Sequence, residues 1–226
     1  MKALLINCTL KRHPDFSNTG ALADKAASQL REQGFETEII RLNDYQVLTG
    51  NSSDEGGGDQ WPLILEKIKS CQIFIIATPI WMGHLASTAQ KVIERLDAIF
   101  RDEELSNQEN GQYMPYNKVG GCLVTGNEDG AHSCAAQVLW ALQEVGFTIP
   151  PNVNAYWVGM AGGEKDYVEA GGERYLYTNK TLRYMTANLA WFAKLLAANP
   201  IGTNLLEEDK KAEAESDKQE GYYQRY

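Results

Sequence analysis

Small polar side chains and two cations follow the first apolar run of the chain. Residues 3–6 are apolar, and the stretch at 7–22 reads NCTLKRHPDFSNTGAL before it passes into helical spacing. The N-terminus of a helix offers unpaired backbone N–H groups and a partial positive charge, which suit a phosphate group. The same hydroxyl and amide side chains also suit plain helix caps. The candidates for a phosphate site are Thr9, Lys11, Arg12, Ser17, Asn18 and Thr19.

Two common phosphate-binding motifs are missing from this stretch. Neither Gly-x-Gly-x-x-Gly nor the Gly-Lys-Ser/Thr pattern of a P-loop follows the first apolar run. A Rossmann dinucleotide site and an NTPase therefore lose most of their support. We expect a different phosphate-bearing ligand.

A second candidate loop, TPIWMG at 78–83, follows the most apolar run of the chain. Pro79 fixes the turn, Gly83 lets the backbone approach a ligand closely, and Trp81 offers a flat apolar face. A single Trp beside a strand is also typical of a core. The candidate residues here are Thr78, Pro79, Ile80, Trp81, Met82 and Gly83.

A third candidate loop joins another apolar run to a helical stretch. Its backbone N–H groups suit the carbonyls of a planar heterocycle or a developing anion, and an ordinary capped loop is the alternative. His84 and His132 stand close to such loops, but isolated histidines are mostly structural or solvated, and no catalytic residue is assigned. The candidate residues are Thr125, Gly126, Asn127, Glu128, Asp129 and Gly130.

The elements that must position these loops alternate along the chain. Apolar runs predict strands, and amphipathic stretches between them predict helices. Several runs are apolar on both faces, as central parallel strands are when helices cover each side, so we predict an α/β three-layer sandwich with the candidate loops at the carboxyl ends of the strands. The predicted strands are 2–7, 36–41, 72–77, 119–125 and 153–158, and the predicted helices are 19–33, 61–70, 84–100, 131–145 and 178–198.

One large domain at 1–200 is expected, with an acidic and disordered tail at 201–226. The segments at 50–60 and 161–172 are rich in glycine and charge, which predicts surface loops, either mobile flaps or ordinary solvent loops.

Composition excludes several classes of protein. The net charge of −9 argues against a general nucleic-acid or anionic-membrane surface, because both require clustered cations. The four cysteines are widely spaced and histidines number three, so no metal site is expected and the thiols are interpreted as packed and free. Neither a signal peptide nor a membrane span is apparent, and we expect a soluble cytoplasmic protein.

Taken together, the three loops resemble the flavodoxin-like NAD(P)H-dependent FMN reductase family. The matching stretches are NCTLKRHPDFSNT, ATPIWMGHLASTAQKVIERLD and LVTGNEDGAHSCAAQVLWALQEVGFTIP, and the resemblance covers about residues 1–198. It implies a five-stranded parallel sheet in the order 2-1-3-4-5, bound FMN, NAD(P)H as electron donor, and a homodimer or homotetramer.

The resemblance also implies roles for the candidate residues. Thr9, Ser17, Asn18 and Thr19 would hold the FMN phosphate, with Lys11 or Arg12 reducing the local negative charge. Residues 79–83 would line the flavin ring on one side, and residues 125–130 would contact its pyrimidine end. Backbone N–H groups around 126–129 would stabilise the negative charge that forms after hydride transfer.

The expected function is that of an FMN-dependent oxidoreductase that reduces a small acceptor such as a quinone, a nitro or azo compound, or free flavin. The first loop is longer than that of electron-carrier flavodoxins and lacks their glycine, and the cysteine-rich segment of iron–sulfur relatives is absent. A flavodoxin-like electron carrier and a flavin-free regulatory protein are the alternatives.

Overall fold

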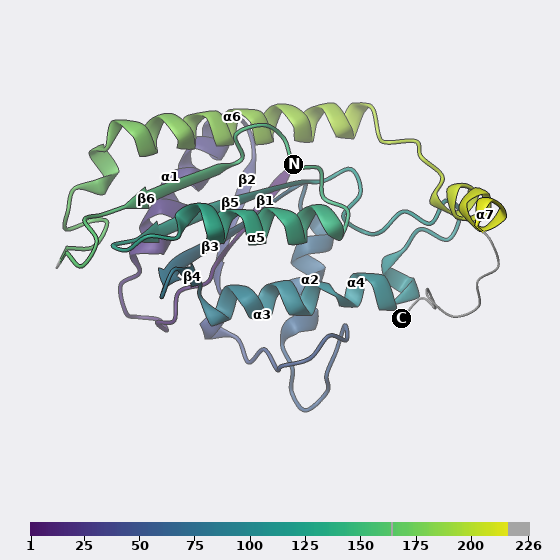
Figure 1. The fold of residues 1–226 in the computed structure, drawn as a ribbon, viewed down its shortest axis with the longest axis horizontal. Helices are drawn as coiled ribbons and strands as arrows, with labels where there is room; N and C mark the ends of the chain where they lie inside the picture. Colours follow the sequence, from purple (N-terminus) through teal and green to yellow (C-terminus); the bar gives the residue numbers. More distant parts are fainter. Residues whose placement is uncertain (164, 217–226) are drawn as a thin grey trace.

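Five parallel strands form the centre of the molecule. A computed structural model describes residues 1–163 and 165–216. The sheet order is β2-β1-β3-β5-β6 (Figure 1), with β4 (His84–Leu85) as a short antiparallel partner of β3. Counting the parallel strands alone, this is the predicted order 2-1-3-4-5, which is that of the flavodoxin-like fold. The strands are β1 (Lys2–Asn7), β2 (Glu36–Arg41), β3 (Ile73–Trp81), β5 (Val119–Gly126) and β6 (Asn154–Val158).

Helices cover both faces of the sheet (Figure 1). One face packs against α1 (Asn18–Glu32) and α6 (Leu176–Ala198), and the other against α2 (Trp61–Ser70), α3 (Ser87–Leu96) and α5 (Ala131–Glu144). The prediction of a single helix at 84–100 is wrong at both ends. Its first two residues form β4, and its last residues belong to a separate short helix, α4 (Ala98–Arg101). Three short 3-10 helices lie between these elements: η1 (Leu42–Asp44), η2 (Glu103–Leu105) and η3 (Gly172–Arg174).

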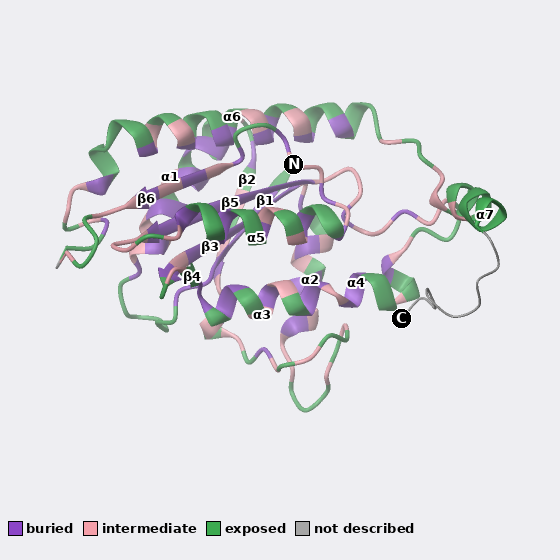
Figure 2. Cartoon of the chain, viewed as in Figure 1, coloured by how far each residue is buried: buried purple, intermediate pink, exposed green. Residues whose placement is uncertain are grey.

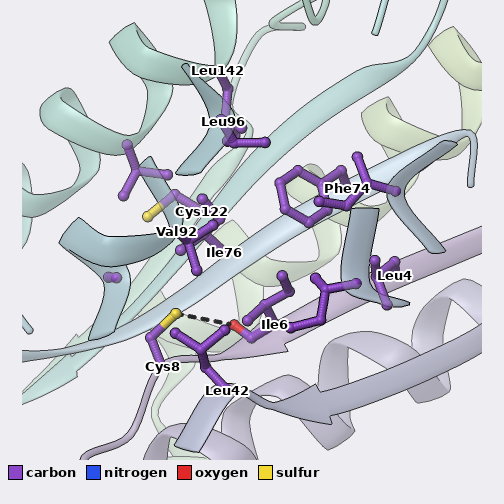
Figure 3. Packing of buried hydrophobic residues seen from close by; sticks show 14 of the residues in the cluster. Leu4, Ile6, Cys8, Leu42, Phe74, Ile76, Val92, Leu96, Cys122 and Leu142 are labelled. Atoms are coloured by element: carbon purple, nitrogen blue, oxygen red, sulfur yellow. Dashed lines mark hydrogen bonds between the residues drawn. The ribbon is translucent and has the colours of Figure 1, made fainter. Parts of the chain in front are cut away.

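Alternate residues of the central strands pack into two separate cores. Leu4 and Ile6 of β1 pack with Phe74 and Ile76 of β3 under α2, α3 and α5 (Figure 3), whereas Leu5 packs into the core beneath α1 and α6. Because successive strand side chains point to opposite faces, a strand between two helical layers must be apolar throughout. This confirms the interpretation of the continuous apolar runs as central strands.

All four cysteines are free and buried, which confirms their interpretation as packed thiols. The Cys8 thiol lies 3.8 Å from the Ile6 carbonyl (Figure 3). Burial raises the pKa of the Cys8 thiol far above its usual range, so the sulfur stays protonated and is a poor nucleophile.

The segment at 50–60 is attached to the core through a buried ion pair. Arg95 on α3 contacts Asp59 at 2.8 Å, and both side chains are 0% exposed. The same guanidinium donates to the carbonyl of Leu48 at 3.1 Å and to that of Ser52 at 2.8 Å. The prediction of a surface loop is therefore wrong for Asp59, because a matched cation and backbone donors compensate the burial of its charge.

The C-terminal segment holds a helix where disorder was predicted. Helix α7 (Leu205–Glu215) is capped by Asn204, whose side chain accepts from the Glu207 N–H, and it has no buried residue (Figure 2). Gln112 donates to the carbonyls of Ile201 and Thr203 at 2.8 and 2.9 Å and thereby anchors the chain before the helix. Acidic composition gives no indication of these contacts, so the predicted disorder is wrong for 205–215. Residues 217–226 lie outside the described residues.

None of the helices in the described parts of the chain is long and apolar enough to cross a membrane.

Asp59→Asn should destabilise the fold by about 3 kcal/mol at pH 7, because it leaves the Arg95 charge buried without its partner. Burial raises the pKa of Asp59, but hydrogen bonds from three backbone N–H groups and from Arg95 outweigh burial and hold it below its usual range. A carboxylate with a lowered pKa contributes stability above its unfolded pKa, about 3.9, and loses that contribution as the pH falls through the folded value.

Urea unfolding of wild type and variant at pH 7 and at lower pH values measures this effect. The difference in free energy of unfolding between wild type and Asp59→Asn should have its largest value at pH 7 and should decrease below about pH 4. Glu32→Gln is the matched control, because it breaks the exposed Arg183–Glu32 pair and should cost less than about 0.5 kcal/mol. Equal small losses in both variants would contradict the assignment of a buried pair.

Candidate functional site

A cleft opens at the carboxyl edge of the sheet, where the three candidate loops meet. The first loop contributes Thr9, Lys11, Asn18 and Thr19 to its lining, β3 contributes Pro79, Ile80 and Trp81, and the third loop contributes Thr125, Gly126, Asn127 and Glu128. The structure thus brings together residues that lie up to about 120 positions apart in the chain, as expected for the carboxyl ends of parallel strands. The other predicted residues, Ser17, Thr78, Met82, Gly83, Asp129 and Gly130, lie beside the cleft without lining it.

The first loop presents the N-terminus of α1 to the cleft. Ser17 is the N-cap of α1, and its hydroxyl accepts from the Gly20 N–H at 3.0 Å and from the Asn7 amide at 3.1 Å. The helix-cap alternative therefore holds for Ser17, and its predicted contact with a phosphate stays a prediction. The first turn of α1 holds no acidic residue of its own, and the Asp166 carboxylate contacts the Asn18 amide at 3.1 Å.

A hydroxyl pair connects the first and third loops. Thr19 Oγ1 and Thr125 Oγ1 lie 2.7 Å apart, and both side chains are buried. Because Thr19 is in the first turn of α1 and Thr125 is near the end of β5, the bond fixes the helix end against the strand. The two loops thus form one rigid wall.

The second candidate segment is a β-hairpin and not the predicted loop. Strand β3 continues through Trp81, and Met82 and Gly83, at φ 53° and 77°, make a two-residue turn into β4. Positive φ at both positions is what a tight type I′ hairpin turn requires. The side chain of Trp81 is 53% exposed and that of Met82 is 86% exposed, so the alternative of a core tryptophan is wrong.

The Thr78 hydroxyl makes hydrogen bonds to the backbone at both ends of the hairpin. It accepts from the Ala86 N–H at 3.0 Å and donates to the Pro79 carbonyl at 2.9 Å. Since Thr78 is fully buried, the hydroxyl serves the hairpin and does not reach the cleft.

Glu128 attaches the tip of the hairpin to the third loop. One carboxylate oxygen accepts from the Met82 N–H and the other from the Gly83 N–H, each at 3.1 Å. Gly130, at φ 127°, lies so close that a Cβ there would be 2.6 Å from the Gly83 carbonyl oxygen. The hairpin and the third loop are therefore held as one unit.

Four further cleft residues were not identified from the sequence, namely Leu10 in the first loop and three from the C-terminal half of the chain. Trp157 on β6 is in register with Thr125, and Asp166 and Tyr167 come from the segment between β6 and α6. Trp157 was not identified because it lies within an apolar strand. Tyr167 was not identified because the glycines and charges of its segment predicted solvent exposure. The structure buries Tyr167 to 1% exposure, so that prediction is wrong for this residue.

The two candidate histidines lie outside the cleft. His132 Nε2 is 3.0 Å from the Tyr156 hydroxyl, and His84 is exposed on β4. Within the parts of the chain that the structure describes, no group of three His, Cys, Asp or Glu side chains could hold a metal ion.

Glu128→Ala should loosen the tip of the hairpin without unfolding the protein. The Met82 and Gly83 amides lose their acceptor, so their hydrogen exchange should become at least several-fold faster, while Tm changes little because the site lies at the surface. Exchange resolved at single residues measures this, with the exposed neighbour Asp129→Ala as control. Unchanged exchange at both amides would mean that the carboxylate does not hold the turn.

Comparison with known proteins places the chain in a family. A relative from Streptomyces davaonensis, described as 8-demethyl-8-aminoriboflavin-5'-phosphate synthase, is 40% identical over 226 aligned residues. The alignment covers 96% of this chain and 86% of the relative. A second relative, described as divalent metal cation transporter MntH of Mycobacterium bovis, is 39% identical over 88% of this chain, which spans only 29% of that protein.

The crystal structure of RosB with the bound intermediate 8-demethyl-8-formylriboflavin-5'-phosphate is similar over nearly the whole chain. It superposes with a TM-score of 0.90 at 38% identity, over 99% of this chain and 91% of that one. The family model for NADPH-dependent FMN reductase matches residues 1–161, which include the three loops of the cleft. This chain therefore belongs to the NADPH-dependent FMN reductase family.

Proposed function

We propose that this protein binds FMN in the cleft and acts as an NAD(P)H-dependent oxidoreductase that reduces a small acceptor. The observation that carries the proposal is the convergence of a helix N-terminus, a flat apolar hairpin and a glycine-rich loop in one cleft of a family member. The residues fit the cofactor, since one end of the cleft suits an anion and the other a planar ring.

The phosphate of FMN would lie at the N-terminus of α1. Thr9, Asn18 and Thr19 line this end, where the backbone N–H groups of Asn18 and Thr19 and the hydroxyl of Thr9 suit phosphate oxygens. Lys11 supplies a positive charge at the same end. Asn18 contributes through its position in the first turn, because its side-chain amide already contacts Asp166 and Val168.

The ring would lie against the hairpin and the third loop. Pro79, Ile80 and Trp81 give it an apolar surface, and the exposed Trp81 and Met82 leave room for an acceptor or a nucleotide to stack beside it. When bound, FMN would take a hydride from NAD(P)H and pass the two electrons on to the acceptor. The task of the chain is then to orient the ring and to keep one side of it open.

A second candidate function treats the flavin as substrate. The Streptomyces davaonensis relative is named for a flavin with an amino group at position 8, and its similarity extends past residue 161 to nearly the whole of this chain. On this proposal the cleft would bind riboflavin 5'-phosphate and release it changed at position 8. A homodimer or homotetramer also stays a proposal.

Three measurements on the purified protein separate the candidates. Titration with FMN tests binding, anaerobic mixing with NADH or NADPH tests reduction through loss of flavin absorbance, and mass spectrometry of flavin recovered after aerobic incubation with an amine donor tests modification. Bleaching with a nucleotide and an unchanged flavin mass support the reductase. A flavin of changed mass supports the synthase, and binding without bleaching by either nucleotide indicates an electron carrier.

Lys11→Gln should weaken FMN binding roughly three- to tenfold and leave riboflavin binding unchanged, because a phosphate near this side chain loses a favourable charge. The effect should diminish at high salt. Arg12→Gln is the matched control, since Arg12 does not line the cleft. Equal losses for FMN and riboflavin would show that Lys11 does not act on the phosphate.

A further inference from the structure

A carboxylate stands at the end of the cleft that a flavin phosphate would occupy. Asp166 lines the cleft together with Asn18 and Thr19 of the first turn of α1, and it is exposed to solvent. One of its carboxylate oxygens accepts from the Asn18 side-chain amide at 3.1 Å. A negative charge therefore lies beside the helix N-terminus before any ligand binds.

Within residues 1–163 and 165–216, which the structure describes, no ion pair includes Asp166. Its side-chain partner, the Asn18 amide, is a neutral donor. An aspartate carboxylate carries a full negative charge at neutral pH. The charge of Asp166 is therefore available to act on a ligand in the cleft.

The segment that carries Asp166 is held against α1 by more than this one contact. The Val168 N–H donates to the Asn18 side chain at 3.0 Å, and the Asp166 carbonyl accepts from the Ala170 N–H at 2.8 Å. The intervening Tyr167 is 1% exposed, so its side chain is packed in the protein. A change confined to the Asp166 carboxylate should therefore leave the segment in place.

A phosphate at this helix end would lie close to the carboxylate. The proposed phosphate site uses the backbone N–H groups of Asn18 and Thr19, and Asp166 contacts the side chain of the same Asn18. The two charges would then be separated by no more than about the ~8 Å Debye length of physiological salt, so screening would be incomplete. A phosphate monoester carries about 1.5 to 2 negative charges at pH 7, whereas riboflavin has no phosphate, so the carboxylate would repel FMN alone.

We propose that Asp166 is a specificity-determining residue, whose charge opposes the flavin phosphate and so limits the preference of the cleft for FMN over riboflavin. The proposal rests on the proposed binding of FMN. Lys11 lines the same cleft with the opposite charge, so the preference depends on the balance between the two side chains. A weaker hold on the phosphate also suits the second candidate function, in which the flavin is released. The match to the family model ends at residue 161 and does not include Asp166.

Asp166→Asn tests the proposal, because it removes the charge and keeps an oxygen that can accept from Asn18. The affinity for FMN, measured by fluorescence titration, should rise about three- to tenfold, because the repulsion of the phosphate is lost. The affinity for riboflavin should not change. The gain for FMN should diminish at high salt, because added ions screen the repulsion that remains in wild type.

Glu169→Gln is the matched control. Glu169 belongs to the same segment, is exposed and does not line the cleft, so the same change of charge there should leave both affinities unchanged. Both variants change exposed side chains, so the Tm of each flavin-free variant should stay within about 2 °C of wild type.

An FMN affinity that is unchanged or lower in Asp166→Asn would overturn the proposal. An equal gain for riboflavin would also overturn it, because the effect would then not involve the phosphate, and so would an equal gain in Glu169→Gln. If wild type itself fails to bind FMN, the proposed function fails and this proposal with it. The titration of wild type therefore distinguishes the two failures.

Discussion

The parallel pairing of the central strands is the constraint on which the cleft depends. Pro79 on β3, Thr125 on β5 and Trp157 on β6 are neighbours in one row of the register, and alternation along the strands turns all three toward the layer that contains α1. A slip of one residue in either pairing would turn a side chain of this row to the opposite face. Two fully apolar cores fix the register, so the packing of the fold determines the composition of the site.

Local contacts then hold the loops on this edge in a shape that is formed before any ligand arrives. The Thr19–Thr125 hydroxyl pair joins α1 to β5, and Glu128 joins the third loop to the hairpin. The carboxylates of Glu128 and Asp166 also line the cleft, and both accept hydrogen bonds from the chain. The first turn of α1 holds no acidic residue of its own, so the Asp166 carboxylate, which Asn18 contacts, is the negative charge at this end of the helix.

Apolar runs and loop positions were enough to predict the layers and most of the residues that line the cleft, and the resemblance to the family implied the sheet order. The rest depended on contacts that composition does not reveal. Asp59 was expected at the surface because nothing near it in the chain indicates that Arg95 is its partner. The strand character of Ile80 and Trp81 depends on pairing with β4, and the helix at 205–215 depends on an Asn204 cap and on contacts from Gln112. Composition describes a segment by itself, whereas each of these features is a contact between segments.

Tyr167 shows the same limit at the site, because it lines the cleft from a segment that composition predicted to be exposed. The three loops belong to the part of the chain that matches the family, so they account for what members share, which is a cleft for a flavin. The segment between β6 and α6 lies beyond that match, within the longer region shared with the Streptomyces davaonensis relative. Asp166 and Tyr167 of this segment line the cleft, and Asp166 accepts a hydrogen bond from Asn18 in the first turn of α1. The wall of the cleft at this end of α1 therefore includes a contact with a segment outside the part of the chain that the family model matches.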